Sequence, residues 1–255
     1  MKALKFLALG IASLPLFSGC ETMSQIASSL PQNTPGTTTS TGSTSGTISQ
    51  TEAVTGIKQA LNNGLQNSIK TLSASNGFYG DALVKILMPQ EAQKVEQVLR
   101  SAGMGKLVDN FLLSLNRAAE GAVKEAAPVF VNSLSQMTVT DAFNILIGGQ
   151  QDAATNFFKR TTSASLTEKF NPIVESALGK NNVSTYWTQL TSAYNALPLS
   201  NNKVQTDLKA YVTQKAIDGL FLKVAEEELK IRQNIGGSRN SSILQSVFGW
   251  VDKQK

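Results

Sequence analysis

A chain of 255 residues is long enough to bury a sizeable core, and 41% hydrophobic with 16% charged residues is the composition of a globular protein low in charge. The sequence has no histidine and one cysteine, which excludes histidine-dependent catalytic pairs, histidine-ligated zinc, thiolate metal sites and intrachain disulfides. The formal charge is +5, and it falls to +3 once residues 1–19 are left out. Such a mild balance gives no basis for binding nucleic acid. We therefore expect no metal, no cofactor and no nucleic-acid partner.

The N-terminus has the parts of a secretory signal. Lys2 and Lys5 precede an apolar run over residues 6–17, which is too short to span a bilayer, and small residues lead to Cys20. The ending "Phe-Ser-Gly-Cys" resembles a bacterial lipobox, in which the cysteine becomes the first mature residue and is acylated, although Phe17 replaces the usual leucine. An ordinary secretory signal with an incidental free cysteine is the alternative. We predict a lipoprotein signal peptide over residues 1–19 and lipid attachment at Cys20.

The residues that follow the cysteine predict a tether. Glu21 is not the aspartate that keeps enteric-type lipoproteins at the inner membrane, which by analogy favours the outer membrane. Residues 20–50 are dominated by Ser, Thr, Gln, Gly and Pro, and such a segment cannot bury enough apolar surface to offset the ordering of its backbone. We expect it to be disordered, with a root-mean-square reach of about 30 Å.

Helical periodicity and helix-terminating residues dominate residues 51–255, and strand signals are scarce. The pattern predicts a single all-α domain, a multi-helix bundle. Thr140 is expected as an N-cap and Gly148 as a helix stop, while Pro128 and Pro172 are expected to kink or divide longer helices. The helices are expected near 51–73, 89–102, 105–136, 139–147, 152–178, 183–196, 206–233 and 239–252.

The helix near 206–233 is apolar around most of its circumference, which predicts a central position in the bundle. Three charged residues interrupt its apolar sides. Glu228 and Arg232 are spaced i,i+4 as an acid–base pair, which a buried setting would require to be well hydrogen-bonded. Asp218 falls between apolar neighbours, and a carboxylate so placed can serve as a general acid. Asp218 and Glu228 are thus weak catalytic candidates; capping of a neighbouring helix or pairing with a cation is the favoured role for Asp218.

Three further side chains are weak candidates for ligand binding, besides Arg232. Asn116 and Glu120 lie on the flank of an amphipathic helix, where a solvated face is the simpler explanation. Arg160 is followed by two threonines and could bind an anionic group. No glycine-rich phosphate loop and no glutamate motif of a glycan-cleaving enzyme is present.

Five phrases in order resemble a bacterial family of unknown function, domain-of-unknown-function family 4197. They are "NRAAE" (116–120), "DAATNFF" (152–158), "FNPIV" (170–174), "KAIDGLF" (215–221) and "AEEELKIR" (225–232). The resemblance covers roughly residues 51–249. It implies an exported, all-helical periplasmic domain, often with a lipoprotein leader, and supplies no reaction and no catalytic residue.

We expect an outer-membrane lipoprotein whose helical domain faces the periplasm and binds an envelope protein, a lipid or a small ligand. The first alternative is an acid–base hydrolase that uses Asp218 or Glu228 on an envelope glycan such as peptidoglycan, which requires a solvent-reachable cleft beside one of them. The second alternative is lipid binding inside the bundle, which requires a continuous apolar cavity.

Overall fold

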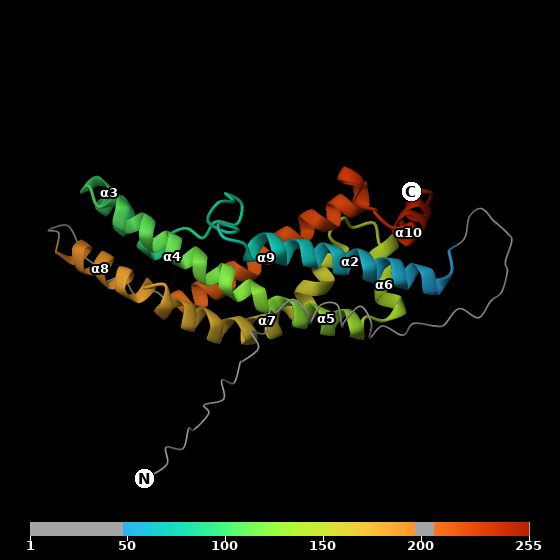
Figure 1. Cartoon of the computed structure of the whole chain (residues 1–255), viewed down its shortest axis with the longest axis horizontal. Helices are drawn as coiled ribbons and strands as arrows, with labels where there is room; N and C mark the ends of the chain where they lie inside the picture. The colour runs from blue at the N-terminus through green and yellow to red at the C-terminus, as the bar shows by residue number, and fades with distance from the viewer. Residues whose placement is uncertain (1–47, 197–206, 255) are drawn as a thin grey trace, which may run out of the picture. The chain divides into compact units, whose positions relative to one another are not determined.

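The helices of the chain pack side by side, as the ribbon shows (Figure 1). The computed structural model describes residues 48–196 and 207–254, and no strand occurs in these ranges, so the prediction of an all-α fold is confirmed. None of the helices in the described part is long and apolar enough to cross a membrane. The α-helices are α2 (Gln50–Ser73), α3 (Gln93–Ser101), α4 (Gly105–Val123), α5 (Ala127–Gln136), α6 (Val139–Ile147), α7 (Ala153–Lys180), α8 (Val183–Asn195), α9 (Leu208–Gln233) and α10 (Ser242–Asp252), with short 3-10 turns at Gln90–Ala92, Lys124–Ala126 and Ile235–Gly237.

Most helix ends lie where the sequence predicts them. Gly103, with a φ of +81°, follows α3, and the N–H groups of Gly103 and Met104 donate to the carbonyls of Arg100 and Leu99. These two bonds form a Schellman motif, in which glycine relieves the strain of a left-handed conformation. Gly148 ends α6 as expected, but the prediction of Thr140 as its N-cap is wrong. Thr138 caps α6 instead, because its hydroxyl accepts the N–H of Asp141 and forms a capping box.

The two internal prolines behave differently. Pro128 lies in the first turn of α5, directly after the 3-10 turn that separates α5 from α4, so it divides the predicted 105–136 helix. Pro172 lies inside α7, which nevertheless continues from Ala153 to Lys180. Pro172 therefore does not divide its helix, and a kink at this residue stays a prediction.

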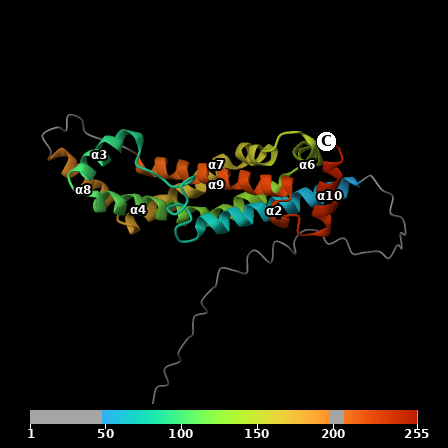
Figure 2. The ribbon, with the colours of Figure 1, turned by 90° about the horizontal axis from the view of Figure 1, so that it is seen from above.

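The four long helices α2, α4, α7 and α9 form the middle of the bundle. α9 contacts α7, α2 and α4, and α4 also contacts α7 and α2. In the two views, α3 and α8 lie at one end of these helices and α6 and α10 at the other (Figures 1 and 2). The predicted central position of α9 is thus observed, but one side of this helix is open: Leu222 is 39% exposed, and Lys215 and Asp218 are exposed as well.

Residues 74–92 connect α2 to α3 without a long helix of their own. In Figures 1 and 2 this connection is the teal coil beside the long helices. Within it, large apolar side chains are deeply buried and openly exposed within a few residues of one another. This connection, named here the connecting segment, positions the candidate site.

Candidate binding groove

The connecting segment alternates between buried and exposed side chains over its second half. Val84, Ile86 and Met88 are at most 6% exposed, whereas Leu83 is 70% and Leu87 57% exposed. Residues 82–84 belong to a turn, in which the N–H groups of Val84 and Lys85 donate to the carbonyl of Asp81, whereas residues 85–89 lie outside any turn or helix. Over this second stretch an alternation of period two is the signature of extended backbone that rests one face on a core. Leu83 and Leu87 therefore point to solvent from a segment that Val84, Ile86 and Met88 anchor.

Asn116 of α4 holds this segment by its main chain. Its Oδ1 accepts the N–H of Ile86 at 2.8 Å, and its Nδ2 donates to the carbonyl of Ile86 at 2.8 Å and to that of Leu112 at 2.7 Å. Asn116 is 0% exposed. In this low-dielectric setting the amide acts on Ile86 as a neighbouring β-strand would, because it satisfies both polar groups of one residue.

Glu120, one turn further along α4, holds the first half of the connecting segment. Its Oε1 accepts the N–H of Phe78 at 3.3 Å, and its Oε2 pairs with Arg117 at 2.6 Å. Arg117 also donates to the Oδ1 of Asn76 at 2.9 Å. The expectation of a solvated face for Asn116 and Glu120 is wrong, since both are buried and bind the main chain of this segment.

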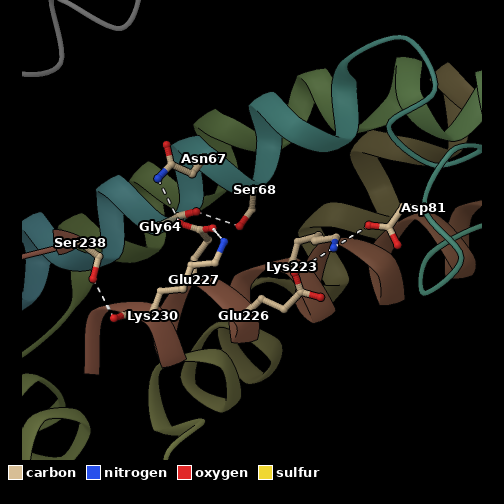
Figure 3. A network of polar contacts seen from close by, with 9 residues as sticks. All are labelled: Gly64, Asn67, Ser68, Asp81, Lys223, Glu226, Glu227, Lys230 and Ser238. Atoms are coloured by element: carbon tan, nitrogen blue, oxygen red, sulfur yellow. Dashed lines mark hydrogen bonds and ion pairs between the residues drawn. The ribbon is translucent and has the colours of Figure 1, made fainter. Parts of the chain in front are cut away.

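α9 holds the connecting segment from its other side. The ammonium of Lys223 lies 2.6 Å from Asp81 and 2.8 Å from Glu226, as the close view shows (Figure 3). The bond to Lys223 and the N–H of Leu83 lower the pKa of Asp81 below its ordinary value. Burial alone would lower the pKa of Lys223, but its hydrogen bonds to Asp81 and Glu226 raise it.

Two further contacts set how closely the segment approaches α9. The hydroxyl of Tyr211 donates to the carbonyl of Leu87 at 3.1 Å, and burial raises the pKa of that hydroxyl. A Cβ at Gly219 would lie 2.8 Å from the Phe78 ring and 3.3 Å from Val84, so only glycine lets the segment lie this close. Leu87 faces Tyr211 and Asp81 faces Lys223, so the segment and α9 run in opposite directions.

A groove of about 480 Å³ lies between the connecting segment and the open side of α9. This volume is within the range of small-molecule and cofactor sites. Its walls combine apolar side chains with two cations and two carboxylates. They are Leu83, Val84, Lys85, Leu87, Met88, Gln90, Glu91, Gln93, Tyr211, Lys215, Asp218, Gly219 and Leu222.

Asp218 lies on the side of Tyr211 and Leu222, as the wheel predicts, and it lines the groove. Its side chain is exposed and accepts a hydrogen bond from Gln214 of the same helix at 2.8 Å. It neither caps a helix nor pairs with a cation among the contacts of the described residues. Asp218 is thus a solvent-reachable member of the groove.

Glu228 is enclosed at the opposite end of α9. It is 7% exposed, its Oε1 accepts from the N–H of Ala154 and from Arg232, and its Oε2 accepts the N–H and the hydroxyl of Thr155. All of these distances lie between 2.7 and 3.0 Å. Ala154 and Thr155 are the second and third residues of α7, so Glu228 caps a helix whose own N-cap, Asp152, makes no side-chain bond.

This arrangement leaves Glu228 and Arg232 without a free position for a ligand. Arg232 also donates to the carbonyl of Ile145 at 2.8 Å. The cavity beside the pair is about 10 Å³, the space of one water molecule. Neither a glycan nor an acyl chain fits there, so Glu228 does not meet the cleft requirement of the hydrolase hypothesis.

The remaining sequence candidates lie apart from the groove. Arg160 is exposed on α7 and stacks over the ring of Phe157, while the hydroxyls of Thr161 and Thr162 donate to helix carbonyls instead of facing an anion. Cys20 lies outside the described residues. No group of three or more His, Cys, Asp or Glu side chains that could hold a metal ion occurs in the described ranges.

The structure thus brings Asp218 to the groove and places Asn116 and Glu120 beneath its wall, whereas Glu228, Arg232 and Arg160 lie elsewhere. Sequence reasoning missed the connecting segment itself. The sequence carries no period-two signal there, because residues 83–88 read Leu-Val-Lys-Ile-Leu-Met and only Lys85 among them is polar. The alternation is visible only in the burial of these side chains.

Comparison with known proteins supplies a family and nothing more specific. The family model described as "Protein of unknown function (DUF4197)" matches residues 47–249. No curated protein and no solved structure matches the chain.

Replacing Asn116 with alanine is expected to destabilise the chain by about 2 to 3 kcal/mol, because the N–H and carbonyl of Ile86 lose their buried partner. Urea unfolding measures the change. Asn110→Ala, at a partly exposed position of the same helix, is the control and should cost less than about 0.5 kcal/mol. Equal losses in the two variants would contradict the anchoring role of Asn116.

Glu228→Gln is expected to lower the free energy of unfolding by about 2 to 4 kcal/mol, because an amide brings a donor against N–H groups and leaves Arg232 without its carboxylate. Glu175→Gln is the matched control. Glu175 is largely exposed and pairs loosely with Lys209 at 3.6 Å, so its loss should stay below about 1 kcal/mol. A Glu228→Gln variant as stable as the control would refute the capping role.

The lowered pKa of Asp81 predicts a pH dependence. A depressed carboxyl pKa stabilises the fold fully above the unfolded value, near pH 3.8, and this contribution is lost as the pH falls through the lower folded value. Asp81→Asn should therefore reduce stability at neutral pH and flatten its decline below about pH 4. Chemical unfolding of both proteins between pH 2 and 7 tests this, and parallel pH profiles would argue against it.

Proposed function

The chain belongs to the DUF4197 family of proteins of unknown function, and on that premise we propose that it is a lipid-anchored periplasmic protein of the outer membrane whose helical domain binds an envelope partner. The family supplies no reaction. The proposal therefore depends on the leader, the tether and the groove.

The groove between the connecting segment and α9 is the observation that carries the binding role. Leu83, Leu87 and Leu222 are 70%, 57% and 39% exposed beside it. A fold does not need leucines at such positions for its own stability, and exposed apolar residues grouped beside a groove are typical of interaction sites. The buried hydrogen bonds from Asn116 and Glu120 to the connecting segment hold this surface in one conformation before a partner binds, which reduces the entropy lost on binding.

The N-terminal sequence supports anchoring. Cys20 after an apolar run and two small residues fits acylation, and two or three acyl chains bind a bilayer firmly because each buried methylene contributes about 0.8 kcal/mol. A Ser/Thr/Gly-rich stretch between Cys20 and α2 would let the domain search for a partner near the membrane.

The hydrolase alternative now depends on Asp218 alone of its two candidates. Asp218 lines the groove together with Glu91, whereas the carboxylate of Glu228 accepts hydrogen bonds from the N-terminus of α7. Lipid binding inside the bundle lacks support from the cavity beside Glu228, which holds no more than one water molecule. Binding at the groove is the role that its residues favour.

The test uses the full chain in a Gram-negative host, with a photo-crosslinking amino acid at Leu222 and a palmitate analogue in the medium. We expect the label on the chain, its recovery with the outer membrane, and a discrete crosslinked adduct after irradiation. Cys20→Ser should remove the label and the membrane association.

Two controls make the crosslink specific to the groove. The same amino acid at Ile147, 53% exposed on α6 and outside the groove, should give no such adduct. Leu87→Asp should abolish the adduct formed at Leu222. Identical adducts from both positions would refute binding at the groove, and an unlabelled soluble chain would refute the anchor.

A further inference from the structure

We propose that the groove binds an extended peptide segment of a partner protein, which pairs with the main chain of residues 85–87 and rests apolar side chains on Leu83, Leu87 and Leu222. This inference depends on the binding role proposed above and specifies the chemical class of the partner. It follows from the polar edge of the connecting segment, from the charges of the groove and from its concave form.

The main chain of the connecting segment has one occupied side and one open side. The N–H and carbonyl of Ile86 face α4, where Asn116 binds both. In extended backbone the polar groups of consecutive residues point to opposite sides, so the carbonyl of Lys85 and the N–H and carbonyl of Leu87 face the groove. The N–H of Lys85 donates to the carbonyl of Asp81 at 2.8 Å, within the turn that precedes this stretch. The Tyr211 hydroxyl, which lines the groove, confirms this direction because it donates to the Leu87 carbonyl.

Two main-chain groups on the open side have no protein partner among the described residues: the N–H of Leu87 and the carbonyl of Lys85. These two groups belong to the two residues that flank Ile86. In a parallel ladder a single partner residue donates to the first carbonyl and accepts from the second N–H. The groove therefore offers a peptide the two bonds of one such pairing, which is how extended ligands add to exposed strand edges.

The charges of the groove favour a peptide over a lipid. Lys85 and Lys215 form no ion pair with a described residue, and neither do Glu91 and Asp218, although all four line the groove. The two Lys ammonium groups lie instead over the rings of Tyr79 and Tyr211. Cations and carboxylates in equal number complement a segment that carries both charges, whereas an anionic headgroup would meet Glu91 and Asp218 as repulsive neighbours.

The concave form of the groove favours a foreign segment over a second copy of this chain. An isologous dimer would place the same hollow against itself. An extended peptide, by contrast, fills a space of about 480 Å³ and leaves Leu83 and Leu87 as its apolar wall. The closely apposed α9 supplies the floor through Lys215, Asp218 and Leu222.

The experiment pans a random dodecapeptide display library on the purified chain carrying Cys20→Ser, so that no lipid is attached. We expect peptides in which apolar and charged residues alternate. Leu87→Asp should weaken their binding about tenfold or more, because a charged side chain replaces the apolar wall. Ile147→Asp, an equally exposed apolar position on α6, should change it less than about twofold.

Amide hydrogen exchange on the chain with Leu87 intact tests the main-chain pairing directly, whether or not the Leu87→Asp variant folds. In the free chain the Leu87 N–H should exchange rapidly and the Ile86 N–H slowly, since Asn116 protects the latter. A bound library peptide should slow the exchange of Leu87 about tenfold or more and leave Ile86 unchanged. A bound peptide that leaves the Leu87 amide unprotected would overturn the pairing.

The remaining outcomes also decide the proposal. Failure to recover any peptide whose binding depends on Leu87 would overturn the proposal. A dimer of the chain, seen by sedimentation, that dissociates in the Leu87→Asp variant would overturn it as well. Binding of vesicles of anionic lipid through Leu87 would assign the groove to a membrane instead. If the adduct at Leu222 forms in cells but the library yields no binding peptide, the groove binds a partner that is not an extended peptide. If the adduct is absent, the proposed binding role of the groove is itself wrong.

Discussion

The hydrogen bonds between the side-chain amide of Asn116 and the main chain of Ile86 are the contact on which the surface of this domain depends. Helices satisfy their own main-chain groups, but an extended stretch beside a helical bundle has no strand to pair with, and buried unpaired N–H and carbonyl groups are costly. One fully buried amide resolves this problem for Ile86. Because the stretch can then bury Val84, Ile86 and Met88, its leucines are presented outward, and the groove against α9 exists.

A second buried carboxylate solves the same problem elsewhere in the bundle. Glu228 gives the N-terminus of α7 the acceptor that Asp152 does not provide, and Arg232 balances its charge. The phrases that carry the family resemblance contain these groups: "NRAAE" holds Asn116 and Glu120, "DAATNFF" holds Ala154 and Thr155, and "AEEELKIR" holds Glu228 and Arg232. Asn171 in "FNPIV" accepts from Thr213 of α9 at 3.0 Å. These four phrases therefore specify how the elements of the bundle join. The fifth, "KAIDGLF", holds Lys215, Asp218 and Gly219, which line the groove.

Sequence periodicity was sufficient to predict the helices but not the residues of the groove, and the reasons are physical. Amphipathic spacing, Pro128 and Gly103 act over one or two turns, so their effects are readable locally. The wheel placed Glu228 beside Arg232 correctly, and yet the third partner, the α7 terminus, is 73 residues away in the chain. Asn116 and Glu120 appeared to face solvent because their partners belong to a segment with no helical signal. Polar residues on a helix flank are ambiguous until the segment that covers them is known.

The alternation within residues 83–88 separates two tasks that most binding surfaces combine. Side chains at 84, 86 and 88 are buried and stabilise the bundle, while Leu83 and Leu87 are largely exposed and the ammonium of Lys85 lies over the Tyr79 ring. Exposed positions tolerate substitution at little cost in stability. A lineage could therefore exchange the three outward residues and acquire a new recognition preference while the helical frame, its caps and its buried amide stayed as they are. In this domain the buried residues fix the backbone beside the groove, and the exposed residues can change without altering it.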